Sequence, residues 1–573
     1  MPVAFGNWRR ALAVGAVAGV IVLYLIAVGI VLAFAGRNMI TGFVTLGRVM
    51  LAIPPLAAGY MIAGRPGPLP SRLAAGLLAG AVSGLILAPA LLFADAVPQV
   101  RDILLRISPK VIAFISFDHP AAFGALVNAG LAAVLGLVGA AARVLPPRLR
   151  ATLVWGALGV VIISMLEPFL RPRLTDFNLG AVSRFLYKSH GLTIVGAAVT
   201  FALFVIFTSF WTPLRARASG AIAASDPRRQ ATIRGLGLLL LIVFLLALPQ
   251  IAGSFLSQVL VFVGLYTLLA LGLNIVVGYA GLLDLGYVAF YAVGSYLTAL
   301  LTSPLSSFGL GLPFWVALPV VILGAALTGL FIGAPVLRLR GDYLAIVTLG
   351  FGEIARILFL SDALKPWLGG TQGILGVPPL LGTSRIDVPI LGWQLSGPTL
   401  TYYPILFFCV VAAFVASRLK HSRTGRAWNA MREDEDVAEA TGVNIVNYKL
   451  LAFALGASVG CLGGAIFATH LGSVYPGTFD VLVSITVLSI IILGGMGSIP
   501  GVVVGSLVLI GLPELLREFA EFRLLVYGGV LVVMMIARPE GLLPDVTRRR
   551  ELHEDEEPET EADATSLAAA EGT

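Results

Sequence analysis

The chain has 573 residues, of which 58% are hydrophobic and only 12% are charged, and its mean hydropathy is +0.95. Ordinary soluble domains carry about 25% charged residues, so this composition excludes a soluble globular protein and indicates an integral membrane protein. The net charge of +7 does not indicate nucleic-acid binding, because the arginines are spread over short loops between apolar segments.

Uncharged segments define the first predicted elements, because about 20 apolar residues in a helix cross the bilayer core. Residues 1–214 are predicted to form a block of about six transmembrane helices. The first apolar run follows Arg9 and Arg10 but is longer than the apolar region of a signal peptide and lacks a convincing cleavage site, which favours a retained helix. Uncharged segments long enough for one span each are residues 11–36, 73–94, 121–142 and 191–214.

A basic connector follows at residues 215–234, and its small, polar and basic composition predicts a cytoplasmic linker. With the N-terminus inside, this connector and the loops that hold Arg65 and Arg143 face the cytoplasm, as the positive-inside rule prefers.

The second block, residues 235–545, is predicted to hold about ten transmembrane helices. Its first uncharged run, residues 235–283, is long enough for two spans, with a break predicted near Pro249 and Gly253. The fold class is therefore predicted to be all-α and polytopic. The final segment, residues 546–573, is acidic and poor in bulky apolar residues, which predicts a disordered tail. Further spans are predicted near residues 285–302, 314–337, 343–361, 401–417, 450–472, 480–496, 500–515 and 524–537.

The sequence contains no HExxH helix and no cluster of His and Cys residues, so a metalloenzyme has little support. It contains no phosphate-binding loop of the form GxxxxGK[ST], so an ATPase that drove this protein would be a separate chain. The two cysteines, Cys409 and Cys461, both lie inside predicted spans, where they are expected to be packing residues. We predict no catalytic residue, no cofactor and no metal site.

Residues 418–449 are the longest strongly charged stretch between spans. The pattern predicts a short cytoplasmic helix pair in which Ala430, Val437 and Ala440 share a buried face. A solvated loop without a partner is the simpler alternative that composition alone leaves open.

Polar residues inside the predicted spans are few, and each is unfavourable there unless it faces protein or a water-filled path. Glu353 and Arg356 lie one helical turn apart, so they either pair with each other or line a substrate route. A tight turn at the membrane surface is predicted where glycines are dense, at Gly494, Gly495, Gly497 and Gly501. The candidates for the translocation pathway are Asn274, Asp284, Tyr287, Thr348, Glu353 and Arg356.

Several ordered motifs between residues 255 and 545 resemble the LivM-type permeases of branched-chain amino-acid ABC importers (the LivHM/urea permease family). They are LGLNIVVGYAGLLDLGYVAFYAVGSY at 271–296, LRLRGDYLAIVTLGFGEIARI at 337–357, GGTQGI at 369–374, SRTGRAWNAMREDEDVAEATGVNIVNYKLLAFALGASVGCLGGAIFA at 422–468, SITVLSIIILGGMGSIPGVVVGS at 484–506 and RPEGLLP at 538–544.

This resemblance implies a permease of the bacterial cytoplasmic (inner) membrane that works in a heteromeric importer. Its implied partners are a second, LivH-like permease, two cytoplasmic LivG/LivF-like ATPases and a periplasmic or lipid-anchored solute-binding protein. It also implies that the charged segment docks on an ATPase as a coupling helix, with a core of small residues and a charged rim. The implied coupling residues are Arg423, Arg426, Arg432, Glu433, Asp434, Ala438, Ala440 and Gly442.

Alternatives remain open at this point. Relatives of this family also move urea or short-chain amides, and the motifs do not separate these cargoes. An ion-coupled secondary transporter would use Asp284 and Glu353 as coupling groups, and a purely structural membrane scaffold is a third reading. The first 234 residues depart from the family. They are expected to pack as peripheral helices beside the permease, and a fused accessory domain is the alternative.

Overall fold

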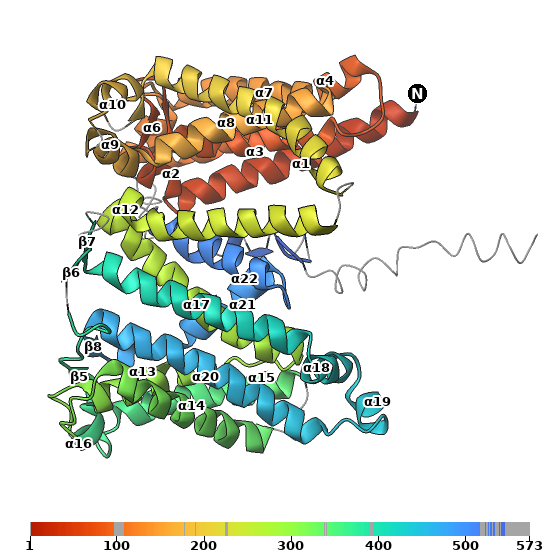
Figure 1. The fold of residues 1–573 in the computed structure, drawn as a ribbon. Coiled ribbons are helices and arrows are strands. Elements are labelled where there is room, and N and C mark those ends of the chain that lie inside the picture. Colours follow the sequence, from red (N-terminus) through yellow and green to blue (C-terminus); the bar gives the residue numbers. More distant parts are fainter. Residues whose placement is uncertain are drawn as a thin grey trace, which may run out of the picture. The chain divides into compact units, whose positions relative to one another are not determined.

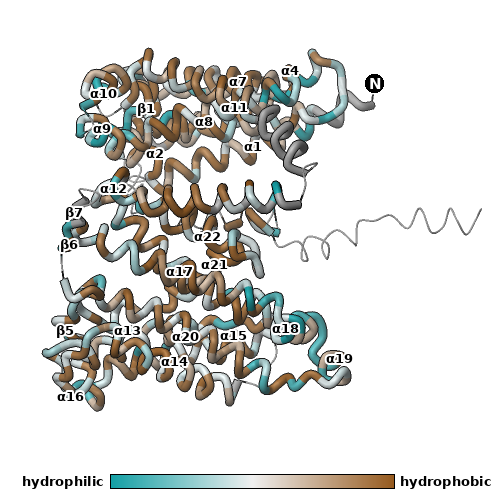
Figure 2. The backbone as a smooth tube through the Cα atoms, in the orientation of Figure 1, coloured by the Kyte–Doolittle hydropathy of each residue, from teal (hydrophilic) through white to brown (hydrophobic). Residues whose placement is uncertain are grey.

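The computed structural model describes residues 2–96, 108–336, 339, 341–515 and scattered positions from 522 to 544, without residues 177, 190, 224–226, 384 and 389–392. The predicted tail and most of the predicted span 524–537 lie outside these residues. The chain divides into two compact units, Met1–Gly237 and Leu238–Thr573 (Figure 1). Eleven helices in the described part are long and apolar enough to cross a membrane, and Figure 2 shows how apolar residues dominate them.

The first unit is built mainly from helices that are tightly packed through small residues. A Cβ added at Gly59 of α3 would lie 1.9 Å from the Gly136 carbonyl oxygen of α7, and one at Gly80 of α4 would lie 2.1 Å from the Ala132 carbonyl oxygen. Glycine at these positions therefore permits the close backbone approach typical of membrane helices. The helices are α1 (Pro2–Ala27), α2 (Ile30–Ala33), α3 (Leu46–Ile62), α4 (Leu69–Ala96), α6 (Pro109–Ile115), α7 (Ala121–Val144), α8 (Pro147–Met165), α9 (Glu167–Asp176), α10 (Gly180–Leu186) and α11 (Ile194–Ala223).

A small four-stranded sheet, which the sequence analysis does not predict, joins distant parts of this unit. Its strands are β1 (Asn38–Ile40), β2 (Val44–Thr45), β3 (Tyr187–Lys188) and β4 (Gly191–Leu192), in the order β2-β1-β4-β3. Strand β1 pairs with β4 in parallel, with Ile40 opposite Leu192. These strands are two or three residues long, so no alternating pattern of apolar and polar residues announces them.

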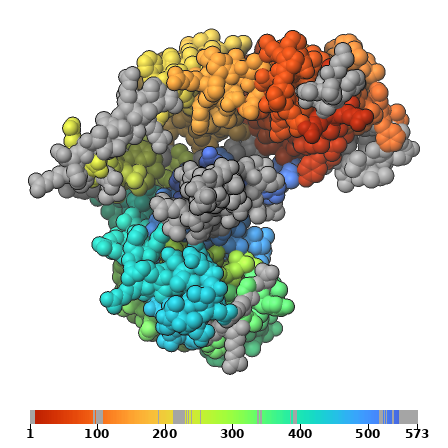
Figure 3. Space-filling view, turned by 90° about the vertical axis from the view of Figure 1, so that its right-hand side faces the viewer, coloured from red at the N-terminus to blue at the C-terminus, as the bar shows by residue number. Residues whose placement is uncertain are grey.

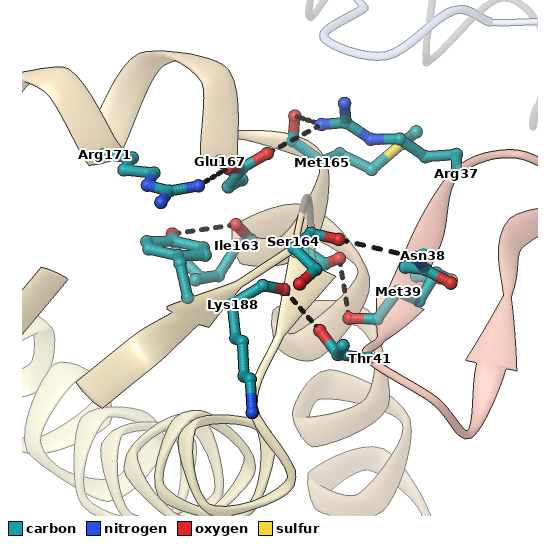
Figure 4. Close-up of polar contacts among 12 residues, drawn as sticks. Arg37, Asn38, Met39, Thr41, Ile163, Ser164, Met165, Glu167, Arg171 and Lys188 are labelled. Atoms are coloured by element: carbon teal, nitrogen blue, oxygen red, sulfur yellow. Dashed lines mark hydrogen bonds and ion pairs between the residues drawn. The ribbon is translucent and has the colours of Figure 1, made fainter. Parts of the chain in front are cut away.

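Side-chain contacts reinforce this sheet where it meets α8 and α9 (Figure 4). The Ser164 hydroxyl donates to the Met39 carbonyl at 2.9 Å, and the Thr41 hydroxyl donates to the Lys188 carbonyl at 2.5 Å. The buried Glu167 carboxylate lies 3.9 Å from the Arg37 guanidinium and 3.3 Å from that of Arg171. The buried acid is thus held by two cations, as a charge in a low-dielectric interior requires.

The second unit carries the remaining helices, and the long helix α12 (Pro227–Leu273) runs into it from the first. Gly253 breaks α12 with φ +83° and ψ 179°, which confirms the predicted break. Helices α11 and α12 also cover most of the connector, so its described backbone is helical. The other elements are η1 (Asn274–Tyr279), α13 (Val288–Thr302), α14 (Phe314–Val336), α15 (Asp342–Leu360), α16 (Lys365–Leu368), η2 (Gly370–Gln372), β5 (Ile374–Leu375), β6 (Arg385–Val388), β7 (Trp393–Ser396), α17 (Pro398–Lys420), α18 (Arg423–Glu433), α19 (Glu435–Ala440), α20 (Ile445–Leu471), β8 (Ser473–Val474), η3 (Pro476–Thr478), α21 (Val481–Gly494), α22 (Ile499–Ser506), η4 (Leu507–Gly511) and α23 (Leu512–Leu515).

The centre of the second unit is the contact between α13 and α20. A Cβ at Gly294 would lie 2.1 Å from the Cys461 carbonyl oxygen, and one at Gly464 would lie 2.1 Å from the Tyr291 carbonyl oxygen. The Ser295 hydroxyl donates to the Gly464 carbonyl at 2.9 Å. This close contact fixes the position of α20, which begins at the end of the charged segment.

Candidate coupling and translocation sites

Two short helices, α18 and α19, form the charged segment between α17 and α20 (Figure 1). Ser422 caps α18, because its hydroxyl accepts a hydrogen bond from the Gly425 amide at 3.3 Å. Asp434 caps α19, because its carboxylate accepts from the Asp436 and Val437 amides at 2.9 and 3.0 Å. Side-chain caps of this kind separate one helix from the next, so the residues between spans form a helix pair rather than one continuous helix.

The buried face of this pair is not the predicted one. Trp428, Met431 and Ala438 are buried, and the Trp428 indole donates to the Tyr448 carbonyl at 2.9 Å. Ala430, Val437 and Ala440, which were predicted to be buried, are exposed, so that prediction was wrong. The large apolar surface of Trp428 and Met431, one turn apart, gains more from burial than the small alanines do.

The opposite face of the pair is available to a partner. Val437 is 59% exposed, and Ala440 of the same short helix is exposed as well. Figure 3 shows the surface of this region in cyan on one face of the second unit. Among the predicted coupling residues, Ala438 is buried and Arg432 is half-buried, and the exposed ones are Arg423, Arg426, Glu433, Asp434, Ala440 and Gly442.

Gly442 ends α19 with a left-handed backbone, φ +90°. The Gly442 amide donates to the Glu439 carbonyl at 2.9 Å, and the Val443 amide donates to the Ala438 carbonyl at 3.1 Å. This is the hydrogen-bond pattern of a Schellman motif, which favours glycine at this position. Gly442 therefore has a structural reason to be glycine that is separate from any docking role.

Arg432 connects the helix pair to the membrane part of the unit. Its Nη1 donates to the Gly278 carbonyl of η1 at 3.0 Å. A Cβ added at Gly281, which has φ +74°, would lie 2.5 Å from the Arg432 Cγ. The chain after η1 thus comes so close to Arg432 that a side chain at Gly281 would collide with it.

Two further contacts bring η1, α17 and the glycine-rich turn together. The Asn274 side chain accepts from the Gly497 amide at 2.9 Å, and the Lys420 ammonium donates to the Gly497 carbonyl at 3.1 Å. A Cβ at Gly278 would lie 2.2 Å from the Asn274 Oδ1. Residues predicted for coupling, for the pathway and for the turn therefore meet at one junction, around Arg432, Asn274 and Gly497.

The glycine-rich segment is a tight turn between α21 and α22. A Cβ at Gly494 would lie 2.1 Å from the Gly501 carbonyl oxygen, and Gly495 and Gly497 have positive φ angles of 118° and 79°. The Leu543 amide donates to the Gly494 carbonyl at 2.9 Å, so the RPEGLLP motif packs against this turn. The glycines serve backbone approach, and none of them adds a side chain to a pathway.

Three pathway candidates are interior residues that organise the backbone. Asp284 accepts from the Gly286 amide at 2.9 Å, the Tyr287 hydroxyl donates to the Gly456 carbonyl at 2.8 Å, and Thr348 accepts from the Leu285 amide at 3.0 Å. All three side chains are buried, as is Asn274. They position the chain between η1 and α13 rather than line an open space in this structure.

Glu353 and Arg356 pair with each other along α15. The Arg356 Nε lies 3.0 Å from both carboxylate oxygens of Glu353, and its Nη2 makes a further contact with Oε1. Both side chains remain about one-third exposed. Of the two alternatives that the sequence analysis gave for these residues, the pairing is present, and part of each side chain stays accessible.

A cavity of about 620 Å³ in the second unit is lined by residues that the sequence analysis did not select. Five aromatic rings are part of its wall, and the rings of Tyr291 and Phe467 lie tilted to each other with centroids 5.1 Å apart. Among the described residues that line it, Glu514 is the only charged one. The signal that was missed is the row of Phe255, Gln258, Phe262 and Tyr266 along α12, at spacings of three and four residues. The lining residues are Phe255, Gln258, Phe262, Leu265, Tyr266, Tyr291, Phe467, Thr478, Val483, Thr486, Ile510 and Glu514.

Comparisons with known proteins point to one family. The family described as "Branched-chain amino acid transport system / permease component" matches residues 255–537. The high-affinity branched-chain amino acid transport permease LivM of Escherichia coli (strain K12) is 38% identical over 369 residues, which cover 61% of this chain and 84% of that protein. LivM of Salmonella typhimurium is 41% identical over 322 residues, which cover 54% of this chain and 74% of that protein. LivH of the same organism is 25% identical over 303 residues, 49% of this chain and 93% of LivH. No solved structure matches the chain.

Proposed function

Because the chain belongs to the family of permease components of branched-chain amino-acid transport systems, we propose that residues 235–545 form half of the translocation pathway of an ATP-driven importer for branched-chain amino acids. The chain is a multi-pass protein of the bacterial inner membrane. The sequence contains no phosphate-binding loop, so ATP is hydrolysed on separate cytoplasmic chains in this proposal.

The observation that carries the proposal is the two-sided character of the α18–α19 pair. Its inner face is anchored by Trp428 and Met431, while its outer face presents Val437 and Ala440 to a partner. An apolar centre with charged residues around it has the arrangement of a protein interface, whose core is apolar and whose rim is polar. Force applied to such a pair by an ATPase reaches η1 through the hydrogen bond from Arg432 to Gly278.

The chemistry expected of the ATPase surface follows from a hollow beside the pair. This hollow of about 280 Å³ is lined by Gly281, by Arg432 and by the acidic run from Glu433 to Asp436, so four acidic residues and one cation face it among the described residues. An acidic hollow next to an exposed apolar residue favours a partner with a basic side chain beside an apolar groove. The further proposed partners are a second LivH-like permease, two LivG/LivF-like ATPases and a periplasmic or lipid-anchored solute-binding protein.

The aromatic-walled cavity supports a cargo with an apolar side chain. Phe255, Tyr266 and Phe467 offer apolar surface, while Gln258 and Glu514 offer polar groups to a zwitterionic head. A small polar cargo such as urea would leave most of this wall without a contact. The second permease would complete the pathway.

The proposal is tested by reconstituting the chain with the ATPases, second permease and binding protein encoded beside it. Val437→Asp places a charge at the centre of the docking surface, so we expect loss of ATPase copurification and of leucine uptake. Asn447→Asp is the matched control, because it adds the same charge at an exposed position in the first turn of α20. Normal ATPase association and uptake in Val437→Asp would refute the docking role, and uptake of urea but not leucine by the unaltered complex would refute the cargo.

A further inference from the structure

The first unit, for which the family gives no role, contains a crevice of about 360 Å³ between α1, α3, α4 and α7. Its wall is almost entirely apolar. The two neutral polar residues in it direct their donors to the protein: the Ser83 hydroxyl donates to the Gly80 carbonyl at 2.7 Å, and the Asn128 amide donates to the carbonyls of Ile115 and Gly124, both at 2.8 Å. The interior of the crevice therefore suits a hydrocarbon chain better than a polar ligand.

Arg48, in the first turn of α3, is the only charged residue among the described residues that line the crevice. The guanidinium lies over the rings of Phe117 and Phe114, with 4.9 and 5.6 Å from its central carbon to the ring centroids. Arg48 is exposed, and no carboxylate among the described residues forms an ion pair with it. Stacking occupies a face of the guanidinium plane and leaves N–H groups along its edge for an anion.

The backbone beneath Arg48 is held in an unfavourable conformation. Phe117 and the next residue, Asp118, have φ angles of +57° and +60°. Residues other than glycine, asparagine and aspartate rarely adopt positive φ angles. The Asp118 amide donates to the Ala113 carbonyl at 2.9 Å, which closes this turn after α6. Bulky residues persist in such conformations where the surroundings fix them, often at binding sites. Here the turn places the Phe117 ring against the arginine at the mouth of the crevice.

We propose that this crevice binds one anionic phospholipid, with an acyl chain between α3 and α7 and the phosphate at Arg48. Three of the helices around the crevice, α1, α4 and α7, are long and apolar enough to cross a membrane, and α3 is a shorter apolar helix. The lining residues Phe43 and Val134 are 71% and 55% exposed, so bilayer lipid is the ligand expected to reach the crevice. The Arg48 guanidinium at its mouth favours headgroups of net negative charge. This site is independent of the transport proposed above.

The full-length protein, purified in detergent, can be titrated with phosphatidylglycerol and with phosphatidylcholine of the same acyl chains, and bound lipid counted by native mass spectrometry. We expect one phosphatidylglycerol to bind about fivefold or more tightly than phosphatidylcholine. Arg48→Gln should abolish this preference, Arg48→Lys should keep most of it, and Ala52→Phe should weaken both lipids by filling the crevice. Arg184→Gln, which removes an exposed arginine of the same unit that does not line the crevice, should change nothing.

Equal binding of the two lipids by the unaltered protein would overturn the proposal without any variant. So would an unchanged preference in Arg48→Gln. Displacement of the bound lipid by millimolar inorganic phosphate would also overturn it, because it would reveal a simple anion site that gains nothing from the acyl chain.

Discussion

The Arg432 guanidinium donates a hydrogen bond to the Gly278 carbonyl across 154 positions of sequence, at 3.0 Å. Arg432 belongs to the helix pair proposed to dock on an ATPase, and Gly278 belongs to η1, which leads into the chain around Asp284. A hydrogen bond to a charged donor in a partly buried site stabilises by about 1.5–3 kcal/mol. This contact is thus strong enough to hold α18 and η1 together when either one moves.

Breaking this bond should separate ATPase binding from transport. We expect Arg432→Ala to assemble with its ATPases and hydrolyse ATP, but to lose at least tenfold in uptake rate, because the docking face is intact while its link to η1 is cut. Arg432→Lys should retain more uptake, since an ammonium can still donate one hydrogen bond. Uptake and ATPase rates of the same proteoliposome preparation provide the measurement. Wild-type uptake by Arg432→Ala would show that movement reaches the membrane part by another route.

A second prediction concerns the ion pair of Lys449 with Glu435, whose Nζ and Oε1 lie 2.7 Å apart. The lysine is buried, and removing one partner of a buried pair costs about 3–5 kcal/mol, with the lower end expected here because Glu435 is partly exposed. Lys449→Met should therefore lower the thermal stability of the purified protein. The double variant with Glu435→Gln should recover part of the loss, and the absence of any recovery would mean that the two side chains are not energetically coupled.

The stability of variants at Gly442 should depend more on the backbone conformation that the new residue tolerates than on the size of its side chain. Its φ of +90° disfavours residues with a Cβ, whereas the space around it is open. We expect Gly442→Ala to destabilise α19 by about 1–2 kcal/mol, and Gly442→Asn to cost less, because asparagine tolerates left-handed conformations. Melting temperatures of the two variants give the comparison. If the larger asparagine proved as disruptive as alanine or more so, crowding rather than conformation would govern this position.

The turn between α21 and α22 should not accept even a methyl group. A Cβ at Gly501 would lie 2.5 Å from the Gly494 carbonyl oxygen, so Gly501→Ala should cost about 1–3 kcal/mol by overpacking and reduce the yield of monodisperse protein. Gly477→Ala is the control, because nothing lies within 4 Å of its added Cβ. Equal yields for both variants would show that this turn opens easily.

The sidedness of the helix pair can be measured directly. A cysteine at the exposed Arg426 should react with a membrane-impermeant maleimide only after the cell is opened, because residues 418–449 are predicted to be cytoplasmic. The parent protein, with Cys409 and Cys461 in α17 and α20, measures the background. Labelling in intact cells would invert the predicted topology.

The sequence by itself determined the features that depend on neighbouring residues. Runs of apolar residues predicted the membrane helices, the break at Gly253 and the helix pair, because hydropathy and helix-ending signals act over one or two turns. The family resemblance also needed nothing more than ordered motifs. These inferences do not depend on contacts with distant parts of the chain.

Tertiary structure decided which face of each helix is buried and which side chains meet. Ala430, Val437 and Ala440 are spaced in the sequence as a small apolar stripe. Trp428 is buried against α20 instead, and this leaves the stripe exposed to solvent. Asn274, Arg432 and Gly497 carry no local sign that they meet, and the aromatic cavity takes its wall from elements spread between α12 and α23. Such contacts are selected by packing between separate helices and turns, some of them more than a hundred residues apart, and a local pattern contains no information about that choice.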